Sequence, residues 1–161
     1  MINMSEKLLN TFHSLNEMAN IKSNRLKFKI DTPLHFYKQS DVISIKHGPR
    51  VKVFEHTSDD GFSIQIGEEL SAVKKASGHG NGHLSTGDIN KLINDIRLNR
   101  FAILEFFYNS AYREPDFIRH VRSKDYTEQL KRYIKYVAGL EAQGELKRVN
   151  YTAKDLEAFL N

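Results

Sequence analysis

Lysine and arginine residues gather in one segment near the beginning of the printed sequence. Residues 22–52 contain only two acidic residues, Asp31 and Asp41, whereas the whole chain has 24 Lys and Arg against 20 Asp and Glu. The basic residues of this segment are Lys22, Arg25, Lys27, Lys29, Lys38, Lys46, Arg50 and Lys52. Clustered cations attract phosphate groups, because each neutralised phosphate releases condensed counterions. The segment therefore predicts contact with nucleic acid or with a nucleoprotein complex.

Basic and apolar residues alternate at residues 25–30, and the same alternation recurs at 50–53. A period of two predicts half-buried strands whose cations share the face opposite the core. An aromatic side chain near that face, Tyr37, is a candidate for stacking on bases. The residues that we expect to bind nucleic acid are Arg25, Lys27, Lys29, Tyr37, Lys46, Arg50 and Lys52. A second interpretation is that the lysines solvate an open sheet face and protect edges from pairing.

Glycines and histidines form a loop at residues 77–84, directly before a predicted helix. Backbone N–H groups at a helix start favour an anion, and nearby imidazoles add hydrogen bonds or charge. The candidate anion-binding residues are His79, Gly80, His83 and Ser85. A flexible connector is the alternative, since the loop matches neither a Walker loop nor a dinucleotide fingerprint. A metal site at these histidines needs further ligands, for example from Asp88, and we predict no metal and no cofactor.

The absence of cysteine excludes disulfides, thiolate metal sites and cysteine nucleophiles. We expect a small non-catalytic regulatory protein that binds nucleic acid through a basic sheet face. One alternative is a protein-binding inhibitor or antitoxin-like partner that uses aromatic surface and the C-terminal helices. A second is a metal-independent ribonuclease that combines His35, His47 or His56 with a phosphate clamp. The cations at residues 119–135 either extend a basic groove or solvate one side of a helix.

The beginning of the sequence contains no basic segment followed by a continuous apolar run. No window of the chain has the length and apolar composition that a membrane span needs. We therefore expect a cytoplasmic protein with no membrane partner.

Hydrophobic periodicity predicts one α+β domain over residues 1–161. We expect a curved antiparallel sheet of about five strands, packed on a long central helix and flanked by N-terminal and C-terminal helices. The expected helices are 5–20, 86–109 and a C-terminal helical region 116–161 that contains a helix at 125–142 and a short final helix ending at 160. The β region covers 25–74, with strands at 25–30, 34–38, 42–46, 50–55, 62–66 and a short one at 70–74. Ser85 and Thr152 are each followed three residues later by an aspartate, which indicates a helix N-cap.

Residues 50–109 resemble a small bacterial domain family of unknown function. The resemblance lies in strand-like stretches at 50–54 and 62–68, a glycine before a leucine at 82–84, and helical residues at 88–93 and 99–105. The family carries a Pro-Pro-His-x-His signature at its second strand, and this chain has Asp60-Gly-Phe-Ser-Ile64 there instead. Its members often look like partners in two-gene modules. The resemblance therefore implies a β-hairpin followed by a helix, and a role in regulation or interaction.

Overall fold

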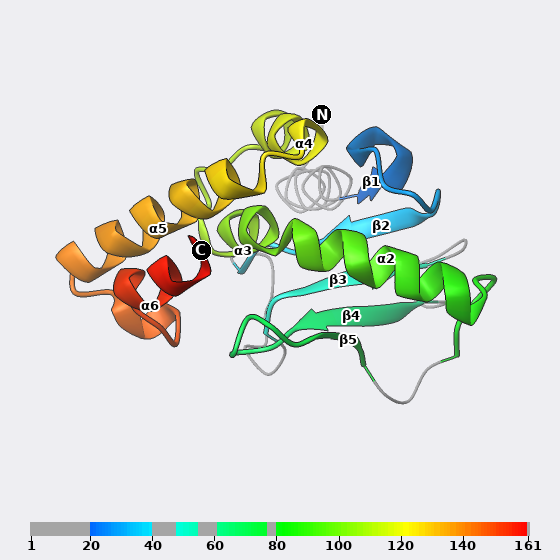
Figure 1. Cartoon of the computed structure of the whole chain (residues 1–161), viewed down its shortest axis with the longest axis horizontal. Helices are drawn as coiled ribbons and strands as arrows, with labels where there is room; N and C mark the ends of the chain where they lie inside the picture. Colours follow the sequence, from blue (N-terminus) through cyan, green and yellow to red (C-terminus); the bar gives the residue numbers. More distant parts are fainter. Residues whose placement is uncertain (1–19, 40–47, 55–60, 77–79, 161) are drawn as a thin grey trace, which may run out of the picture.

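The computed structural model describes residues 20–39, 48–54, 61–76 and 80–160 of the chain (Figure 1). The expected strand at 42–46 lies outside these residues. The expected helix at 5–20 does too, apart from Asn20, which begins a strand. Within the described part, strands come first and most helices follow, so the α+β class is confirmed.

The sheet is an antiparallel meander in which every strand pairs with its sequence neighbours. Its strands are β1 Asn20–Lys22, β2 Pro33–Phe36, β3 Arg50–Val53, β4 Phe62–Ile66 and β5 Val73–Lys75. The expected strands at 34–38, 50–55 and 62–66 correspond to β2, β3 and β4, and β5 begins three residues later than expected. The sheet is not strongly curled, contrary to the expected curvature (Figure 1).

The strand expected at 25–30 is wrong, because this segment folds into a 3-10 turn and a loop. The turn η1 covers Ser23–Leu26 and ends at Lys27, whose φ of 57° is left-handed. The Ser23 hydroxyl donates to the carbonyl of Ile30 and accepts the backbone N–H of Thr32 at 2.7 Å, so one side chain closes the loop. Leu26 and Phe28 are still buried. The alternation therefore predicted burial correctly and backbone conformation incorrectly.

Helices cover the apolar face of the sheet and continue to its side as a helical layer (Figure 1). They are α2 Thr86–Leu98, α3 Arg100–Tyr108, α4 Glu114–Ser123, α5 Tyr126–Ala142 and α6 Ala153–Glu157, with 3-10 turns η3 Leu146–Arg148 and η4 Ala158–Leu160. Every residue of α3 from Phe101 to Tyr108 is buried. The core therefore lies between the sheet, α2 and α3, and it extends between α3 and α5. The helix expected at 125–142 is confirmed as α5.

The single long helix expected at 86–109 is interrupted at Asn99, which separates α2 from α3. Asn99 is buried, with φ −98° and ψ 15°. Its amide donates to the carbonyl of Asp95 at 2.8 Å, and its side-chain oxygen accepts from Gln129 of α5 at 2.9 Å. The buried side-chain amide of Asn99, held by these two partners, thus marks the point where the chain changes direction. The hydrophobic pattern of the sequence does not predict this pairing.

Within the described residues, none of the helices combines the length and the apolar composition needed to cross a bilayer.

Candidate functional site

One face of the sheet carries mostly polar side chains in the described strands, with Pro33 of β2 as an apolar exception opposite Lys22. Leu34, Phe36, Val51, Val53 and Ile64 point into the core from β2, β3 and β4. Side chains between them point to the opposite face, because successive residues of a strand alternate. We call this the polar sheet face; its residues are Asn20, Lys22, His35, Tyr37, Arg50, Lys52, Ser63, Gln65 and Lys74.

Cross-strand register arranges seven of these residues in two rows, while Lys22 lies outside both rows, opposite Pro33 of β2. The first row runs Asn20, His35, Lys52, Ser63 across β1 to β4, and the second runs Arg50, Gln65, Lys74 across β3 to β5. None of the residues of the polar sheet face is acidic. Lys22, Lys52 and Lys74 form no ion pair with any residue in the described ranges. The face therefore concentrates positive charge that its own side chains do not neutralise.

An aromatic and imidazole cluster lies over β1, β2 and β3 on this face. The guanidinium carbon of Arg50 lies 4.2 Å from the centroid of the Tyr37 ring. The His35 ring meets the same tyrosine edge-on, with 4.4 Å between centroids. Nδ1 of His35 lies 2.6 Å from the side-chain oxygen of Asn20. Because an amide oxygen only accepts, Nδ1 carries the proton and the lone pair of Nε2 remains as an acceptor.

His35 reports the electrostatic character of this face. Burial lowers its pKa, and the positive charges of Lys52 and Arg50 lower it further, to about 4. Lys52 is its direct cross-strand partner. At neutral pH the imidazole is therefore uncharged, and the positive charge of the face comes from lysine and arginine.

The structure separates the residues that the sequence placed on one basic surface. Arg50, Lys52 and Tyr37 lie together on the polar sheet face, and Lys46 lies outside the described residues. Arg25 and Lys27 belong to the η1 turn, and Lys29 follows it, with its backbone N–H donating to Asp95 of α2 at 2.9 Å. The expectation that these three cations share a sheet face is wrong, because the segment is not a strand.

Sequence reasoning missed Lys22, Lys74 and His35 as members of the polar sheet face. Lys22 and Lys74 are exposed and flank the buried residues Ile21 and Val73. Their strands are only three residues long, so the alternation is too short to be recognised from the sequence. Cross-strand register brings them together with β3, and register depends on turns that the pattern does not specify.

The glycine and histidine loop leads into α2 as expected. Ser85 is the N-cap, and its hydroxyl accepts the N–H of Asp88 at 3.1 Å. Gly82 has a φ of 58°, which favours glycine, and His83 is exposed. Gly80 is also exposed, and His79 lies outside the described residues. Asp88 places a carboxylate in the first turn, where it interacts favourably with the helix dipole. The case for a bound anion here therefore rests on sequence alone.

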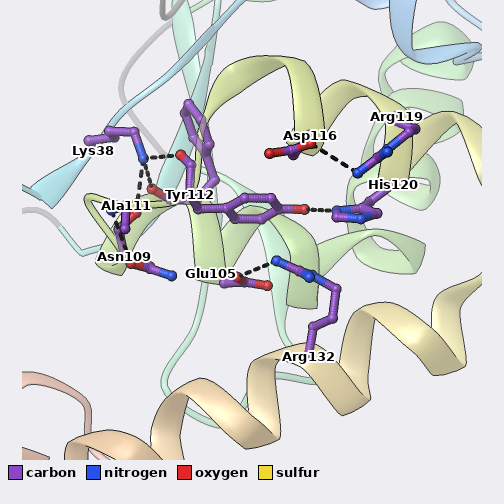
Figure 2. Close-up of polar contacts among 10 residues, drawn as sticks. Lys38, Glu105, Asn109, Ala111, Tyr112, Asp116, Arg119, His120 and Arg132 are labelled. Atoms are coloured by element: carbon purple, nitrogen blue, oxygen red, sulfur yellow. Dashed lines mark hydrogen bonds and ion pairs between the residues drawn. The ribbon is translucent and has the colours of Figure 1, made fainter.

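A second polar cluster joins the helices α3, α4 and α5 (Figure 2). Nζ of Lys38 donates to the carbonyls of Phe106, Asn109 and Tyr112 at 2.8–3.0 Å, where α3 ends. Arg132 of α5 pairs with buried Glu105 of α3 at 3.0 Å.

Tyr112 and His120 form the other contact of this cluster, with 2.6 Å between the hydroxyl oxygen and Nδ1. Burial raises the pKa of Tyr112 and lowers the pKa of His120, so the neutral phenol donates to a neutral imidazole. The guanidinium of Arg132 lies 4.9 Å from the centroid of the same Tyr112 ring.

The cluster borders an open groove of about 400 Å³ between α3 and α5. Burial raises the pKa of Glu105, while the Arg132 charge opposes the shift. Glu105 Oε1 and Arg132 Nε have no hydrogen-bond partner among the described residues, but both atoms are buried away from solvent. A molecule in the groove does not reach them in this arrangement. We therefore assign this cluster to the packing of the helices.

In the described part of the chain, no group of three or more His, Asp and Glu side chains is arranged to hold a metal ion.

Comparison of the chain with protein-family models, curated proteins and solved structures found no match. The resemblance of residues 50–109 to a bacterial family stays a prediction, although a hairpin of β3 and β4 is followed by β5 and α2 in this segment. The functional argument therefore rests on the geometry of the polar sheet face.

Proposed function

We propose that the protein is a small non-catalytic regulatory protein that binds the phosphate backbone of nucleic acid through the polar sheet face. The observation that carries the proposal is the set of cations Lys22, Arg50, Lys52 and Lys74 on a face whose described residues include no acidic side chain. Phosphates approach such a face favourably, because each contact releases condensed counterions.

The charge pattern supports backbone contact more than base stacking. Arg50 covers one side of the Tyr37 ring, and the ring is half-buried. Tyr37, which the sequence suggested as a stacking residue, therefore orients Arg50 toward the ligand instead. Contacts to phosphates position a protein on nucleic acid without reading its sequence. The proposal therefore includes weak dependence on base sequence.

Charge removal on the polar sheet face tests the proposal. In the double variant Lys52→Gln/Lys74→Gln, two cations are lost and neither forms a hydrogen bond or ion pair with a described residue. We expect its affinity for labelled duplexes of about 20 base pairs to fall about tenfold at about 0.1 M salt, because two phosphate contacts are lost. The slope of log affinity against log salt should decrease by about two. Fluorescence anisotropy over a salt series measures both.

Lys131→Gln/Lys154→Gln is the matched control, since it removes the same charge from exposed positions of α5 and α6. It should bind with nearly the affinity of the wild type. When the labelled duplex is RNA, its strands should be intact on a denaturing gel after the binding reaction, because the proposed function is non-catalytic. Equal loss of affinity in both double variants, or no salt-dependent binding by the wild type, would exclude the polar sheet face as the site.

A further inference from the structure

Two lysines adopt a backbone conformation that normally favours glycine. Lys27 has a φ of 57° and Lys124 has a φ of 56°. Lys27 ends the η1 turn and Lys124 ends α4, and both side chains are exposed. Glycine is the usual residue at such a position, because a Cβ crowds the backbone there. Strain that persists on exposed side chains points to a role for the side chains themselves.

The ends of these two helical elements lie at one corner of the molecule, because η1 packs along α4. Arg25 of η1 reaches Glu114 near the start of α4, at 3.8 Å. Arg122, near the end of α4, donates to the backbone carbonyl of Arg25 at 2.9 Å. Residues almost a hundred positions apart in the sequence are thereby brought together. We call Arg25, Lys27, Arg122 and Lys124 the η1–α4 corner.

Three acidic side chains near the corner already have partners. Glu114 faces Arg25, and Asp116 pairs with Arg119 at 2.9 Å. The carboxylate of Asp125 accepts the N–H of Glu128 as the N-cap of α5. Lys27, Arg122 and Lys124 form no ion pair with any residue that the structure describes. The corner therefore keeps positive charge available for a ligand.

Lys22 connects this corner to the polar sheet face. It is a member of β1 on that face, and it is also the residue that precedes η1. A chain of phosphates that leaves Lys52 and passes Lys22 at the β1 edge therefore continues toward Arg25 and Lys27. The polar sheet face and the η1–α4 corner are therefore adjacent, and they meet at the β1 edge of the sheet.

We infer that the η1–α4 corner is a second phosphate-binding site, and that the nucleic-acid backbone runs from the polar sheet face around the β1 edge to Lys27 and Lys124. This inference rests on the proposed function, because it extends the same ligand. A favourable interaction of lysine with the dipole of a helix C-terminus is the competing explanation of both residues. The two explanations predict opposite effects of glycine on stability.

The test is the double variant Lys27→Gly/Lys124→Gly. It removes both charges, and it relieves the steric strain of a Cβ at two backbone positions with left-handed φ. We expect the Tm to stay the same or to rise by about 2–4 °C, since the strain is lost. We expect affinity for a duplex of about 20 base pairs to fall about tenfold at about 0.1 M salt, because two phosphate contacts are lost. Calorimetry and anisotropy measure the two quantities, with duplex DNA and duplex RNA as separate arms.

Lys131→Gln/Lys154→Gln again serves as the control of equal charge. Affinity of the glycine variant equal to that of this control would overturn the inference, and so would a lowered Tm, which would assign the lysines to helix capping. The proposed function fails separately, if the wild type does not bind or the Lys52→Gln/Lys74→Gln variant binds normally. Binding that requires the polar sheet face but not Lys27 and Lys124 would reject the corner alone.

Discussion

His35 shows how neighbouring residues determine the chemistry of a single side chain on the polar sheet face. A half-buried position and the charges of Lys52 and Arg50 lower its pKa from 6.5 to about 4. Asn20 fixes the proton on Nδ1. The residue is thus a neutral hydrogen-bonding group in a positive environment, and its titration is a sensor of that environment.

Lys52→Gln should raise the pKa of His35 toward its ordinary value, because one of the two repelling charges is removed. Saturation of the wild type with duplex should raise the same pKa, since phosphates bring negative charge to the face. NMR titration of the imidazole signals measures both effects. A His35 pKa that ignores both the substitution and the ligand would contradict our account of this site.

The lowered pKa also links His35 to stability. Above pH 6.5 the imidazole is neutral in folded and unfolded chains, and its contribution to stability is fully present. Between pH 6.5 and about 4 only the unfolded chain takes up the proton, so this contribution is progressively lost as pH falls. In urea unfolding experiments, His35→Gln should make the free energy of unfolding less dependent on pH in this interval.

The end of α3 illustrates how elements are joined by a single side chain. Lys38, just after β2, donates to carbonyls of Phe106, Asn109 and Tyr112, where a helix leaves its last carbonyls unpaired (Figure 2). Its ammonium also lies 3.9 Å from the centroid of the Phe106 ring. Lys38 thus attaches the sheet to the helical layer, and it is not part of the polar sheet face.

Lys38→Met should lower the free energy of unfolding by about 2 kcal/mol, because several charge-assisted hydrogen bonds are lost while the apolar stem is kept. Urea unfolding followed by circular dichroism measures the change. Lys131→Met, at an exposed position of α5, should change stability by less than about 0.5 kcal/mol. Equal stability of the two variants would show that the three carbonyls are satisfied without Lys38.

Sequence patterns correctly predicted those elements that are determined by their own residues. The strands β3 and β4, the helix α5 and the N-caps Ser85 and Thr152 all follow from alternation, helical period or capping residues. At residues 25–30 the same alternation misled, because a hydroxyl of Ser23 closes a loop there.

Contacts between distant residues account for the other differences. The break at Asn99 depends on Gln129, thirty positions away, and the cap of Lys38 depends on carbonyls about seventy positions away. The sequence predicted only part of the candidate site, because Lys22 and Lys74 join it through register. Arg122 and Arg25 likewise meet only through tertiary packing.

At the scale of the whole molecule, the helices cover one face of the sheet and leave the charged residues on the other face and at the β1 edge (Figure 1). In the described part of the chain, the large apolar side chains that remain exposed are Leu98 and Leu160, and none is aromatic. The described surface therefore offers a ligand more exposed cations than exposed aromatic rings. Its chemistry suits a ligand with closely spaced phosphates.

Duplex DNA or RNA should bind more tightly than a single strand of equal length, because a duplex presents one phosphate charge per ~1.7 Å of axis. Competition experiments with unlabelled duplexes and single strands, at one salt concentration, measure the difference. Changing the base sequence of the duplex should alter the affinity less than about threefold, since phosphate contacts carry no sequence information. Preference for single strands, or strong sequence discrimination, would indicate base contacts and would contradict binding through phosphates alone.

The nearest-neighbour order of the strands has a consequence for how the chain is made. Each strand of such a meander can pair as soon as it has itself left the ribosome, because its predecessor is already outside and no distant segment is needed. The side destined for the interior is then complete before α2 is synthesised and is briefly left unshielded. We expect Lys22 of β1 and Lys74 of β5, the two edge strands, to discourage neighbouring chains from adding strands to the sheet during that interval.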